Sequence, residues 1–567
     1  MKLIHPKSDT FEHLDEKSRN IMLKTIEFFE NKGLKKLKAD DHARVWYADF
    51  LEFVKKEKVF ATLMTPKGYG PQDSRWDTFR ICDFNEVVSF YGLAYWYTWQ
   101  VSMLGLTPIW MSNNEKVKNK AAQLLQDGEI FAFGLSERAH GADLISSEVT
   151  LHPQDDGTYK ATGRKYYIGN GNKAALVSTF GKIAGTKDYV FFVVSSTHEK
   201  YKCIQNVTAS QNYVAEFELL DYPITEDDIL AKGREAWDMS LATVALCKYN
   251  LGWASVGICT HAFYEAITHA SNRVLFNHAV TEFTHIKQLF VDAYSKLMAM
   301  KLFARRAADY IRSASEADKR YLLYNPMVKM KVTMQGEEVI NLLWDVIAAR
   351  GFEKDLYFEM AARDIRGLPK LEGTAQVNMV LIIKFIENFL FNPAEFAEVP
   401  INNSKDNDSF MFTQGATSKG QNRIVFHDYK KAFGLFKLKN LEIFLQQVDA
   451  FKEMYKNHPP SKEQSRDLDF MLILGEIFTL IPYAQLILEE SHLQKVDPQI
   501  VDQIFDFLIR DFSKYAMMIY TKTSSTDEQM KLCLQMVKKP EKNQERYESV
   551  LNKHVYSLNG QYKMNDG

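Results

Sequence analysis

Cysteine is scarce in this sequence, with five residues among 567. They lie far apart, and no pair has the Cys-x-x-Cys spacing; they are Cys82, Cys203, Cys247, Cys259 and Cys533. This pattern argues against a disulfide framework and against a zinc site, so we expect no metal. It suits the reducing conditions of the cytoplasm.

The sequence also lacks an excess of charge of either sign, since its net charge is −2. It therefore has no electrostatic footprint for nucleic acid or for an anionic membrane. The start, Met1–Pro6, soon turns charged and has no apolar core, so we expect no secretory signal. Nearby acids such as Asp9 and Glu12 disfavour a mitochondrial presequence, and the ending is no peroxisomal tripeptide. We expect a cytoplasmic protein that does not bind nucleic acid.

One stretch is long and apolar enough to raise the question of a membrane span, residues 468–488. Asp469, Glu476 and Pro482 interrupt it. A charge near the middle of a span costs a few kcal/mol, so a buried helix pair in a soluble bundle is favoured. A peripheral membrane contact through this region stays open.

The chain is long enough for two to four domains with buried cores. Apolar positions three and four apart predict helices over 1–130 and again over 236–395. Between them, 131–235 reads as a sheet domain, with β-branched and aromatic runs such as 189–194. The remainder, 396–567, opens with a polar loop at 402–409, and three or four helices fill 429–538 with a break at 458–461. The predicted fold is mostly α-helical with a central β domain.

The sequence Glu372-Gly373-Thr374 is a candidate for catalysis. Gly373 lets the backbone turn and approach a ligand, and Thr374 offers a hydroxyl to that ligand. Glu372 is then held beside the ligand as a base. The alternative is a helix end that carries an ordinary surface glutamate.

Three further segments strengthen the first interpretation. Residues 131–135 alternate as a strand does, and Ser136-Glu137 then opens a loop of small residues that includes Gly141 and Asp143. Residues 162–171 and 273–276 supply a strand with its turn and an Arg-x-x-Phe sequence. In this order and spacing, over about residues 100–385, the four motifs resemble those of the acyl-CoA dehydrogenase family, flavoproteins that desaturate acyl-CoA thioesters.

The resemblance implies a fold and an activity. The fold has an N-terminal helical domain, a β-barrel-like middle domain and a four-helix bundle; the C-terminal helical extension is similar to that of long-chain members. The activity is α,β-desaturation of a fatty acyl-CoA to trans-2-enoyl-CoA, as in fatty acid β-oxidation. Glu372 is the implied general base and FAD the hydride acceptor, with an electron-transfer flavoprotein as partner. We also expect a homodimer, because FAD lies across a subunit contact in this family.

The resemblance also assigns binding residues. Those implied for FAD are Phe133, Leu135, Ser136, Gly141, Ala142, Tyr167, Ile168, Gly169, Arg273, Phe276, Thr284, Asp345, Ala348, Ala349, Thr374 and Gln376. Those implied for the acyl-CoA substrate are Ala142, Lys248, Gly373, Trp96 and Gln100. Trp96 and Gln100 belong to an aromatic run at 95–100, which serves equally well as core packing or as the lining of the acyl pocket.

Several positions depart from the family pattern. Ala348-Ala349 replaces a Gly-Gly pair, and Asp345 replaces a glutamine. Lys248 keeps the charge of an arginine that helps hold substrate but loses its guanidinium fork. Ala142 and Gly169 lack hydroxyl groups that the family places near substrate and flavin. These departures leave two alternatives open: an oxidase-like enzyme that passes electrons to oxygen, and a non-catalytic acyl-CoA-binding or assembly protein on the same fold.

Two other motifs have plainer explanations. Residues 169–174 match Gly-x-Gly-x-x-Ala, but 176–180 reads as a strand, whereas a dinucleotide fingerprint must open a helix. We therefore predict a β-turn there. His427-Asp428 has no nucleophile motif to accompany it and is interpreted as a capping or loop pair.

Overall fold

The computed structural model describes residues 2–401, 408–417 and 420–567. The chain forms two compact units. The mixed unit contains Ser8–Asn250 with Asn403–Lys419 and Met564–Gly567, and the helical unit contains Met1–Lys7, Leu251–Asn402 and Gly420–Lys563. The predicted N-terminal and β segments thus share one unit, and the bundle and the C-terminal extension share the other. Most of the predicted polar loop at 402–409 lies outside the described residues.

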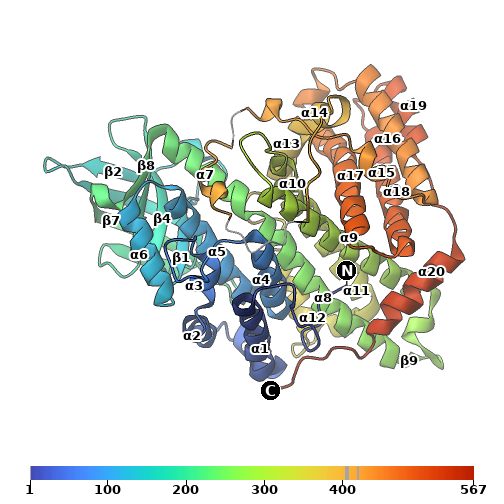
Figure 1. The fold of residues 1–567 in the computed structure, drawn as a ribbon, viewed down its shortest axis with the longest axis horizontal. Helices are drawn as coiled ribbons and strands as arrows, with labels where there is room; N and C mark the ends of the chain where they lie inside the picture. Colours follow the sequence, from blue (N-terminus) through green and yellow to red (C-terminus); the bar gives the residue numbers. More distant parts are fainter. Residues whose placement is uncertain (1, 402–407, 418–419) are drawn as a thin grey trace. The chain divides into compact units, whose positions relative to one another are not determined.

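Helices occupy the first part of the mixed unit, as the spacing of apolar residues predicts. They are α1 (Glu16–His42), α2 (Ala48–Lys56), α3 (Val59–Met64), α4 (Thr78–Tyr91), α5 (Leu93–Met111) and α6 (Glu115–Gln126), with α7 (Gly233–Cys247) after the sheet. Helix α5 is buried from Leu93 to Trp110 and packs against β1 (Figure 1). Its close approach requires Gly105, where an added Cβ would lie 2.6 Å from the carbonyl oxygen of Ala132.

An eight-stranded sheet forms the rest of this unit, and the predicted strands over 131–235 are confirmed. The strands are β1 (Phe131–Gly134), β2 (Thr150–Pro153), β3 (Tyr159–Gly169), β4 (Leu176–Ile183), β5 (Tyr189–Val194), β6 (Tyr201–Asn206), β7 (Val214–Ile224) and β8 (Ile229–Lys232). Their order is β6-β7-β3-β2-β4-β5-β8, with β1 parallel to β4. Residues 170–173 form the predicted turn, in which the N–H of Gly171 donates to the Ile168 carbonyl.

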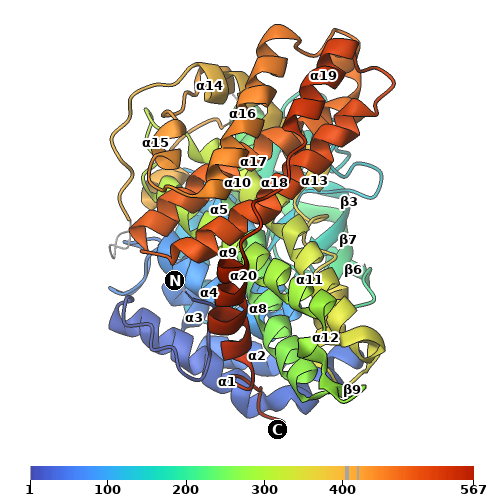
Figure 2. The same cartoon turned by 90° about the vertical axis from the view of Figure 1, so that its right-hand side faces the viewer.

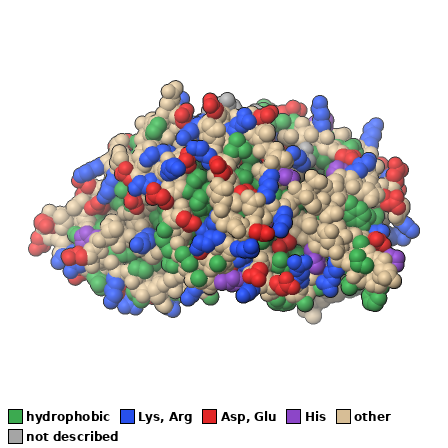
Figure 3. Space-filling view, turned by 90° about the horizontal axis from the view of Figure 1, so that it is seen from below, with side chains coloured by type: hydrophobic (Ala, Val, Ile, Leu, Met, Phe, Trp, Pro, Cys, Tyr) green, Lys and Arg blue, Asp and Glu red, His purple; other side chains and the backbone are tan. Residues whose placement is uncertain are grey.

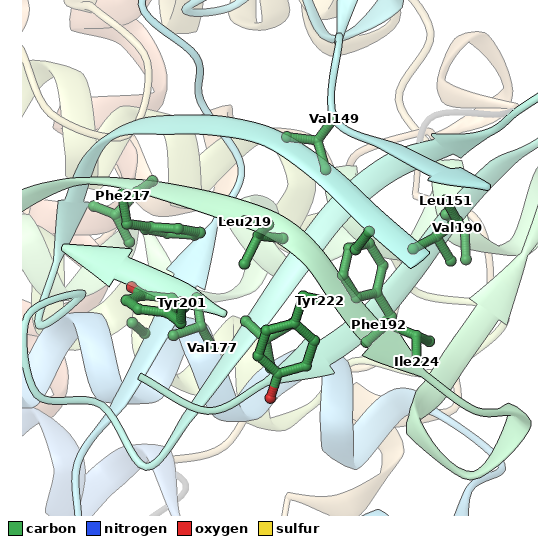
Figure 4. Close-up of a cluster of buried hydrophobic side chains, with 14 of the residues drawn as sticks. Val149, Leu151, Val177, Val190, Phe192, Tyr201, Phe217, Leu219, Tyr222 and Ile224 are labelled. Atoms are coloured by element: carbon green, nitrogen blue, oxygen red, sulfur yellow. The ribbon is translucent and has the colours of Figure 1, made fainter. Parts of the chain in front are cut away.

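The core of the sheet domain is a cluster of buried β-branched and aromatic side chains that project from several strands (Figure 4). Val177, Val190, Phe192 and Phe217 are fully buried there. Burial of such side chains stabilises by roughly 1.5–3 kcal/mol each, which fixes the strands that carry the candidate site.

The first part of the helical unit consists of helices, as the sequence predicts. They are α8 (Tyr249–Asn272), α9 (Thr284–Arg312), α10 (Tyr321–Met327), α11 (Thr333–Ile347), α12 (Tyr357–Asp364), α13 (Ala375–Ile382) and α14 (Ile386–Phe391), with the two-residue strands β9 (Val274–Leu275) and β10 (His278–Ala279) between α8 and α9. Between α10 and α11 the chain makes a π-helical turn at Val328–Val332. The last helix before the extension, α14, ends at Phe391, with Asn392 as its C-cap.

The C-terminal extension adds α15 (Lys430–Phe433), α16 (Lys439–Asn457), α17 (Leu468–Leu493), α18 (Pro498–Tyr520), α19 (Asp527–Met536) and α20 (Gln544–Val550). Helices α17 and α18 pack against α9 of the bundle (Figure 2). Ion pairs join the same helices: Arg510 Nη2 lies 2.6 Å from Asp292 Oδ1, and Arg306 Nε lies 2.8 Å from Glu489 Oε2. The extension is therefore continuous with the bundle and not a loosely tethered addition.

Helix α17 is long and apolar enough to cross a membrane, but 83% of its most apolar window is buried inside the protein. The expectation of a helix pair is wrong in one respect, because α17 continues through Pro482 as a single helix. Most of the apolar side chains of α17 are therefore covered by the protein, and a peripheral membrane contact of the extension stays a prediction.

Charged side chains of both signs are interspersed on the face shown in Figure 3. Many form exposed ion pairs, such as Lys232 with Glu226 at 2.6 Å. This distribution agrees with a net charge of −2.

Candidate functional site

The Glu372-Gly373-Thr374 sequence lies at the start of a helix, whereas the alternative interpretation placed it at a helix end. Turns connect α12 to α13, and the N–H of Leu371 donates to the Gly367 carbonyl at 3.2 Å. Thr374 is the N-cap of α13, and its hydroxyl accepts a hydrogen bond from the Val377 N–H at 3.3 Å. The Thr374 oxygen thus has a structural role in addition to the ligand contact predicted for it.

Glu372 adopts a backbone conformation that is rare for its residue type. Its φ is +52°, and φ of Gly373 is +83°. A non-glycine residue at positive φ costs of order 1–3 kcal/mol and clusters at functional sites. The Glu372 side chain is half-buried. Two successive residues with positive φ therefore interrupt the regular backbone between α12 and α13 at the position that carries this carboxyl group.

Two buried side chains fix the turn. The Lys329 ammonium donates to the carbonyls of Pro369 and Gly373, each at 2.6 Å. The Asn378 amide donates to the carbonyls of Gly373 and Thr374 at 3.1 and 3.0 Å. Both side chains are fully buried. The two hydrogen bonds from Lys329 are charge-assisted, and such bonds are about twice as strong as neutral ones like those of Asn378, so they can hold a strained conformation.

Asp345 and the Ala348-Ala349 pair are exposed at the end of α11. Ala348 has φ +57° and ψ −141°, which glycine adopts without strain. The backbone here therefore has a conformation that suits the glycine of the family pattern, and Ala348 adopts it with strain.

The Arg273–Phe276 segment forms a hairpin beyond α8. Strands β9 and β10 pair there, and Phe276 and Asn277 at the turn have φ of +52° and +64°. These values are those of a type I′ turn, which suits hairpins. Arg273 is exposed, and the Phe276 side chain is 88% exposed. Two other predicted FAD residues, Thr284 and Gln376, are exposed in the first turns of α9 and α13.

In the mixed unit, Tyr167 occupies a β-bulge. The pairing of β3 with β7 shifts register between Lys165 and Ile168, and φ of Tyr167 is +67°. A bulge redirects a side chain, and bulges are common beside active sites. The Tyr167 ring is 44% exposed, whereas the Ile168 side chain belongs to the core of the sheet. Tyr167 therefore presents a ring for stacking, while Ile168 has only its backbone to offer to a cofactor.

A buried ion pair anchors the loop that follows β1. The Lys165 ammonium lies 2.8 Å from Glu137 Oε1 and 2.9 Å from the Leu135 carbonyl. Burial lowers the pKa of Lys165 to about 8, against the opposing effect of Glu137. Burial would raise the pKa of Glu137, but Lys165 and two backbone N–H donors bring it below its usual value. Both groups are therefore charged at neutral pH, and the Ser136–Ser147 loop is held at its base.

The loop itself and the end of β3 carry further predicted residues. Gly141 and Ala142 are exposed, and Ser136 donates to the Tyr166 carbonyl at 2.8 Å. Phe133 and Leu135 are half-buried at the end of β1. At Gly169 an added Cβ would lie 2.6 Å from Val101 and 2.8 Å from Tyr97 of α5. The packing of α5 thus explains why no hydroxyl residue stands at Gly169.

Three of the residues predicted to contact substrate, Lys248, Trp96 and Gln100, are buried, whereas Gly373 is half-buried and Ala142 is exposed. Lys248 is the C-cap of α7 and is 4% exposed. Trp96 donates from its indole to Asn85 at 2.8 Å, and Gln100 accepts from Asn250 at 2.7 Å. Trp96 and Gln100 are fully buried. Both side chains lie in a hydrogen-bonded core. This agrees with core packing, one of the two roles that the sequence allows for them; the other is lining the acyl pocket.

Sequence reasoning missed Lys329, Asn378 and the structural role of Lys165. The signal for Lys329 was available: it is a lysine within the apolar run Met327-Val328-Lys329-Met330. A lysine in such a position needs a buried partner. Its partners, however, lie 40 and 44 residues later and cannot be inferred from spacing.

The residues present fit a flavin cofactor. Tyr167 offers an exposed ring at a bulge, and Gly141 has open space where a Cβ would point. Positive φ at Ala348 and Gly373 brings backbone groups to the surface where a side chain would otherwise interfere. Arg273 supplies an exposed cation suited to a pyrophosphate.

Comparisons with known proteins agree with this assignment. Residues 237–386 match the family model "Acyl-CoA dehydrogenase, C-terminal domain". The 3-(aryl)acrylate reductase of Clostridium sporogenes is 25% identical over 340 residues, which cover 58% of this chain and 89% of that protein. A subunit of the caffeyl-CoA reductase–Etf complex of Acetobacterium woodii is 23% identical and covers 57% of this chain and 86% of its own length.

Among solved structures, an acyl-CoA dehydrogenase of Bacillus anthracis in complex with FAD has a TM-score of 0.75. The alignment is 15% identical and covers 98% of this chain and 99% of that one, so the fold with its C-terminal extension is shared. Residues 237–386 therefore match the C-terminal domain of acyl-CoA dehydrogenases, the chain has their fold, and these findings together support the acyl-CoA dehydrogenase family of flavoprotein oxidoreductases, with FAD as the cofactor.

Proposed function

We propose that the protein is an FAD-dependent acyl-CoA dehydrogenase that converts a fatty acyl-CoA thioester to trans-2-enoyl-CoA. The observation that carries this proposal is Glu372 itself. It is a half-buried carboxyl group in a left-handed turn, and two buried side chains hold that turn. A binding protein without catalysis has no need to keep a strained, anchored glutamate.

The reaction removes a proton from Cα and a hydride from Cβ of the acyl chain. The α proton is a weak acid, so the base must be held within hydrogen-bonding reach of it. Glu372 accepts this proton on its carboxylate, while the turn around Gly373 keeps the carboxylate in place. FAD, when bound, accepts the hydride. Lys248 contributes a positive charge for the substrate in place of the arginine of the family pattern.

Electrons leave the reduced protein through an electron-transfer flavoprotein in this proposal. The relative from A. woodii supports it, since that protein is named as part of a complex with Etf. The low cysteine content and the absence of CxxC pairs support a cytoplasmic location.

A second candidate is the reverse reaction. Both curated relatives described above are named reductases. The same glutamate, once protonated, returns a proton to Cα of a 2-enoyl-CoA, so the geometry serves either direction. The direction depends on the electron partner, and the relative rates with acyl-CoA and with enoyl-CoA decide it.

We expect the purified protein to be yellow and anaerobic acyl-CoA to bleach its flavin band. Titration with saturated acyl-CoAs of several chain lengths tests cofactor, activity and chain preference together. The matching titration of chemically reduced protein with 2-enoyl-CoA tests the reductase candidate. Peroxide formed at the rate of substrate consumption would favour the oxidase-like alternative. A colourless protein that does not take up added FAD would exclude the proposal.

We also propose a homodimer. Several apolar side chains of the helical unit are exposed near the predicted subunit contact: Val274 (64%), Phe276 (88%) and Phe352 (71%). The Arg350 guanidinium contacts His269 Nδ1 at 2.7 Å and so ties the end of α8 to the 348–352 segment. The helices of 429–538 would occupy the side on which shorter members form tetramers.

Light scattering should therefore give a mass twice the 65.5 kDa of the chain. Phe352→Asp should shift this mass towards that of the monomer, because a carboxylate in an apolar contact is costly. Leu534→Asp changes an exposed residue of α19 (52% exposed) and should leave the dimer intact. A wild-type protein that binds FAD and remains monomeric would contradict the proposal.

A further inference from the structure

Lys329 lies in the π-helical turn Val328–Val332 and is fully buried. A buried ammonium is costly unless acceptors surround it. The carbonyls of Pro369 and Gly373, each 2.6 Å away, provide such acceptors. A π-turn adds one residue to a helical turn and is frequent at functional sites. Here it lies where the lysine reaches the segment that carries Glu372.

The two carbonyls flank Glu372 in the chain. Pro369 precedes it by three residues, and Gly373 follows it directly. These hydrogen bonds fix the 369–370 and 373–374 peptide groups, which bracket Glu372, and so restrict the backbone from which its side chain projects. The conformation needs such support, because φ of Glu372 is +52°. Asn378 supports the later side of the turn, at Gly373 and Thr374.

Lys331 offers a comparison within the same π-turn. It is 3% exposed, but its ammonium lies 5.8 Å from the ring of Tyr483 in α17. Its charge favours the ionised forms of Glu476 of α17 and Asp511 of α18. Burial raises the pKa of Glu476, and Lys331 opposes that rise. Burial would also raise the pKa of Asp511, but Lys296 and Lys331 lower it. Two buried lysines, two residues apart, therefore have different partners: one contacts the Glu372 turn and the other acts on the extension.

We propose that Lys329 is a positioning residue for the catalytic base: its ammonium holds the 369–373 turn so that the Glu372 carboxylate meets the substrate in one orientation. The inference rests on the proposed role of Glu372. Lys329 touches neither substrate nor flavin in this account and exchanges no proton with them. Its effect should appear in the rate of the chemical step and not in substrate binding.

The test compares Lys329→Met with Lys331→Met, both as full-length protein with FAD. Each variant removes one buried ammonium from the same turn, so general destabilisation is matched. Hydrogen–deuterium exchange reports on residues 366–376, and stopped-flow anaerobic reduction by an acyl-CoA gives the rate of reduction and the Kd. Butyryl-CoA and palmitoyl-CoA serve as probes.

In Lys329→Met we expect amides of 370–375 to exchange at least about tenfold faster. Reduction should slow by about 100-fold, as expected for a catalytic group displaced by about 1 Å. FAD content and acyl-CoA Kd should stay within threefold of wild type. Lys331→Met should leave both loop exchange and reduction rate within threefold.

Unchanged exchange in Lys329→Met would overturn the inference whatever the activity. Equal loss of rate in both variants, or a loss confined to Kd, would also overturn it. If neither acyl-CoA reduces the flavin of the wild-type protein, the proposed function itself fails, and this outcome is recognised without either variant.

Discussion

Glu372→Gln is expected to slow reduction of the flavin by acyl-CoA by about 10⁴-fold, the upper range for loss of a general base. The amide matches the carboxylate in shape, but it does not accept the α proton at neutral pH. The Lys329 ammonium holds the turn through the backbone carbonyls of Pro369 and Gly373, and the substitution does not change these groups. FAD content and acyl-CoA binding should therefore be preserved. Anaerobic stopped-flow absorbance measures the rate, and the spectral change at saturation measures binding.

Glu387→Gln is the matched control, because Glu387 is an exposed glutamate of the neighbouring helix α14. It should reduce its flavin at the wild-type rate. Exchange of the substrate α proton with D2O should be lost in Glu372→Gln and retained in the control. A Glu372→Gln protein that still reduces its flavin within tenfold of wild type would show that the base lies elsewhere.

Secondary structure was predictable here because it depends on local periodicity. The run Tyr189–Val194 forms β5, and the break at His458–Ser461 separates α16 from α17. Pro482 did not end α17, although proline interrupts a helix. Burial among neighbouring helices, which the sequence does not display, compensates for the lost backbone hydrogen bond.

The sequence named candidate site residues, whose roles stay predictions, but it did not show what supports them. Motif spacing identified Glu372, but its left-handed conformation depends on Lys329, which is 43 positions earlier in the chain. Likewise, Ala348 differs from the family pattern in sequence and yet has a backbone conformation that suits glycine. Such features follow from long-range contacts that fix the backbone, and a single sequence carries no record of them.

His427 shows the same limitation at a second place. The sequence suggested a capping or loop pair with Asp428. Asp428 does accept from the Lys430 N–H, but His427 joins a buried cluster instead. Arg320 can only donate, so its 2.8 Å contact makes His427 Nδ1 an acceptor, and Nε2–H then donates to Glu489 at 3.0 Å. The cluster links the segment after the bundle to α17.

Two adjacent glutamates of α17 beside this cluster should have opposite effects on stability. Burial would raise the pKa of Glu489, but the hydrogen bond from His427 and the charge and hydrogen bond of Arg306 lower it to about 2. Burial and then the charge of Asp309 raise the pKa of Glu490 to about 7. Both compare with an ordinary value of 4.5. The folded protein therefore stabilises the ionised form of Glu489 and destabilises the ionised form of Glu490.

The signs follow from proton linkage. Glu490 binds its proton more tightly when folded, so stability is full below pH 4.5 and is lost as pH rises through about 7. Each pH unit between the two pKa values is worth about 1.4 kcal/mol, so the loss approaches about 3 kcal/mol. Glu489 has the reverse behaviour: its contribution is present above pH 4.5 and is lost as pH falls towards 2.

Glu490→Gln should therefore raise the thermal midpoint of the FAD-bound protein at pH 8.5 and change it little at pH 5, where the native glutamate is mostly protonated. Glu489→Gln should lower the midpoint at pH 8.5, because a neutral amide cannot replace the carboxylate between Arg306 and His427. Differential scanning calorimetry at both pH values, with FAD in fixed excess, measures the two shifts.

Because the substitutions are adjacent and isosteric, a general effect of altering α17 would move both midpoints in the same direction. A stabilised Glu490→Gln beside a destabilised Glu489→Gln thus identifies the charge of each carboxylate as the cause, and a midpoint of Glu490→Gln equal to wild type at pH 8.5 would contradict the raised pKa.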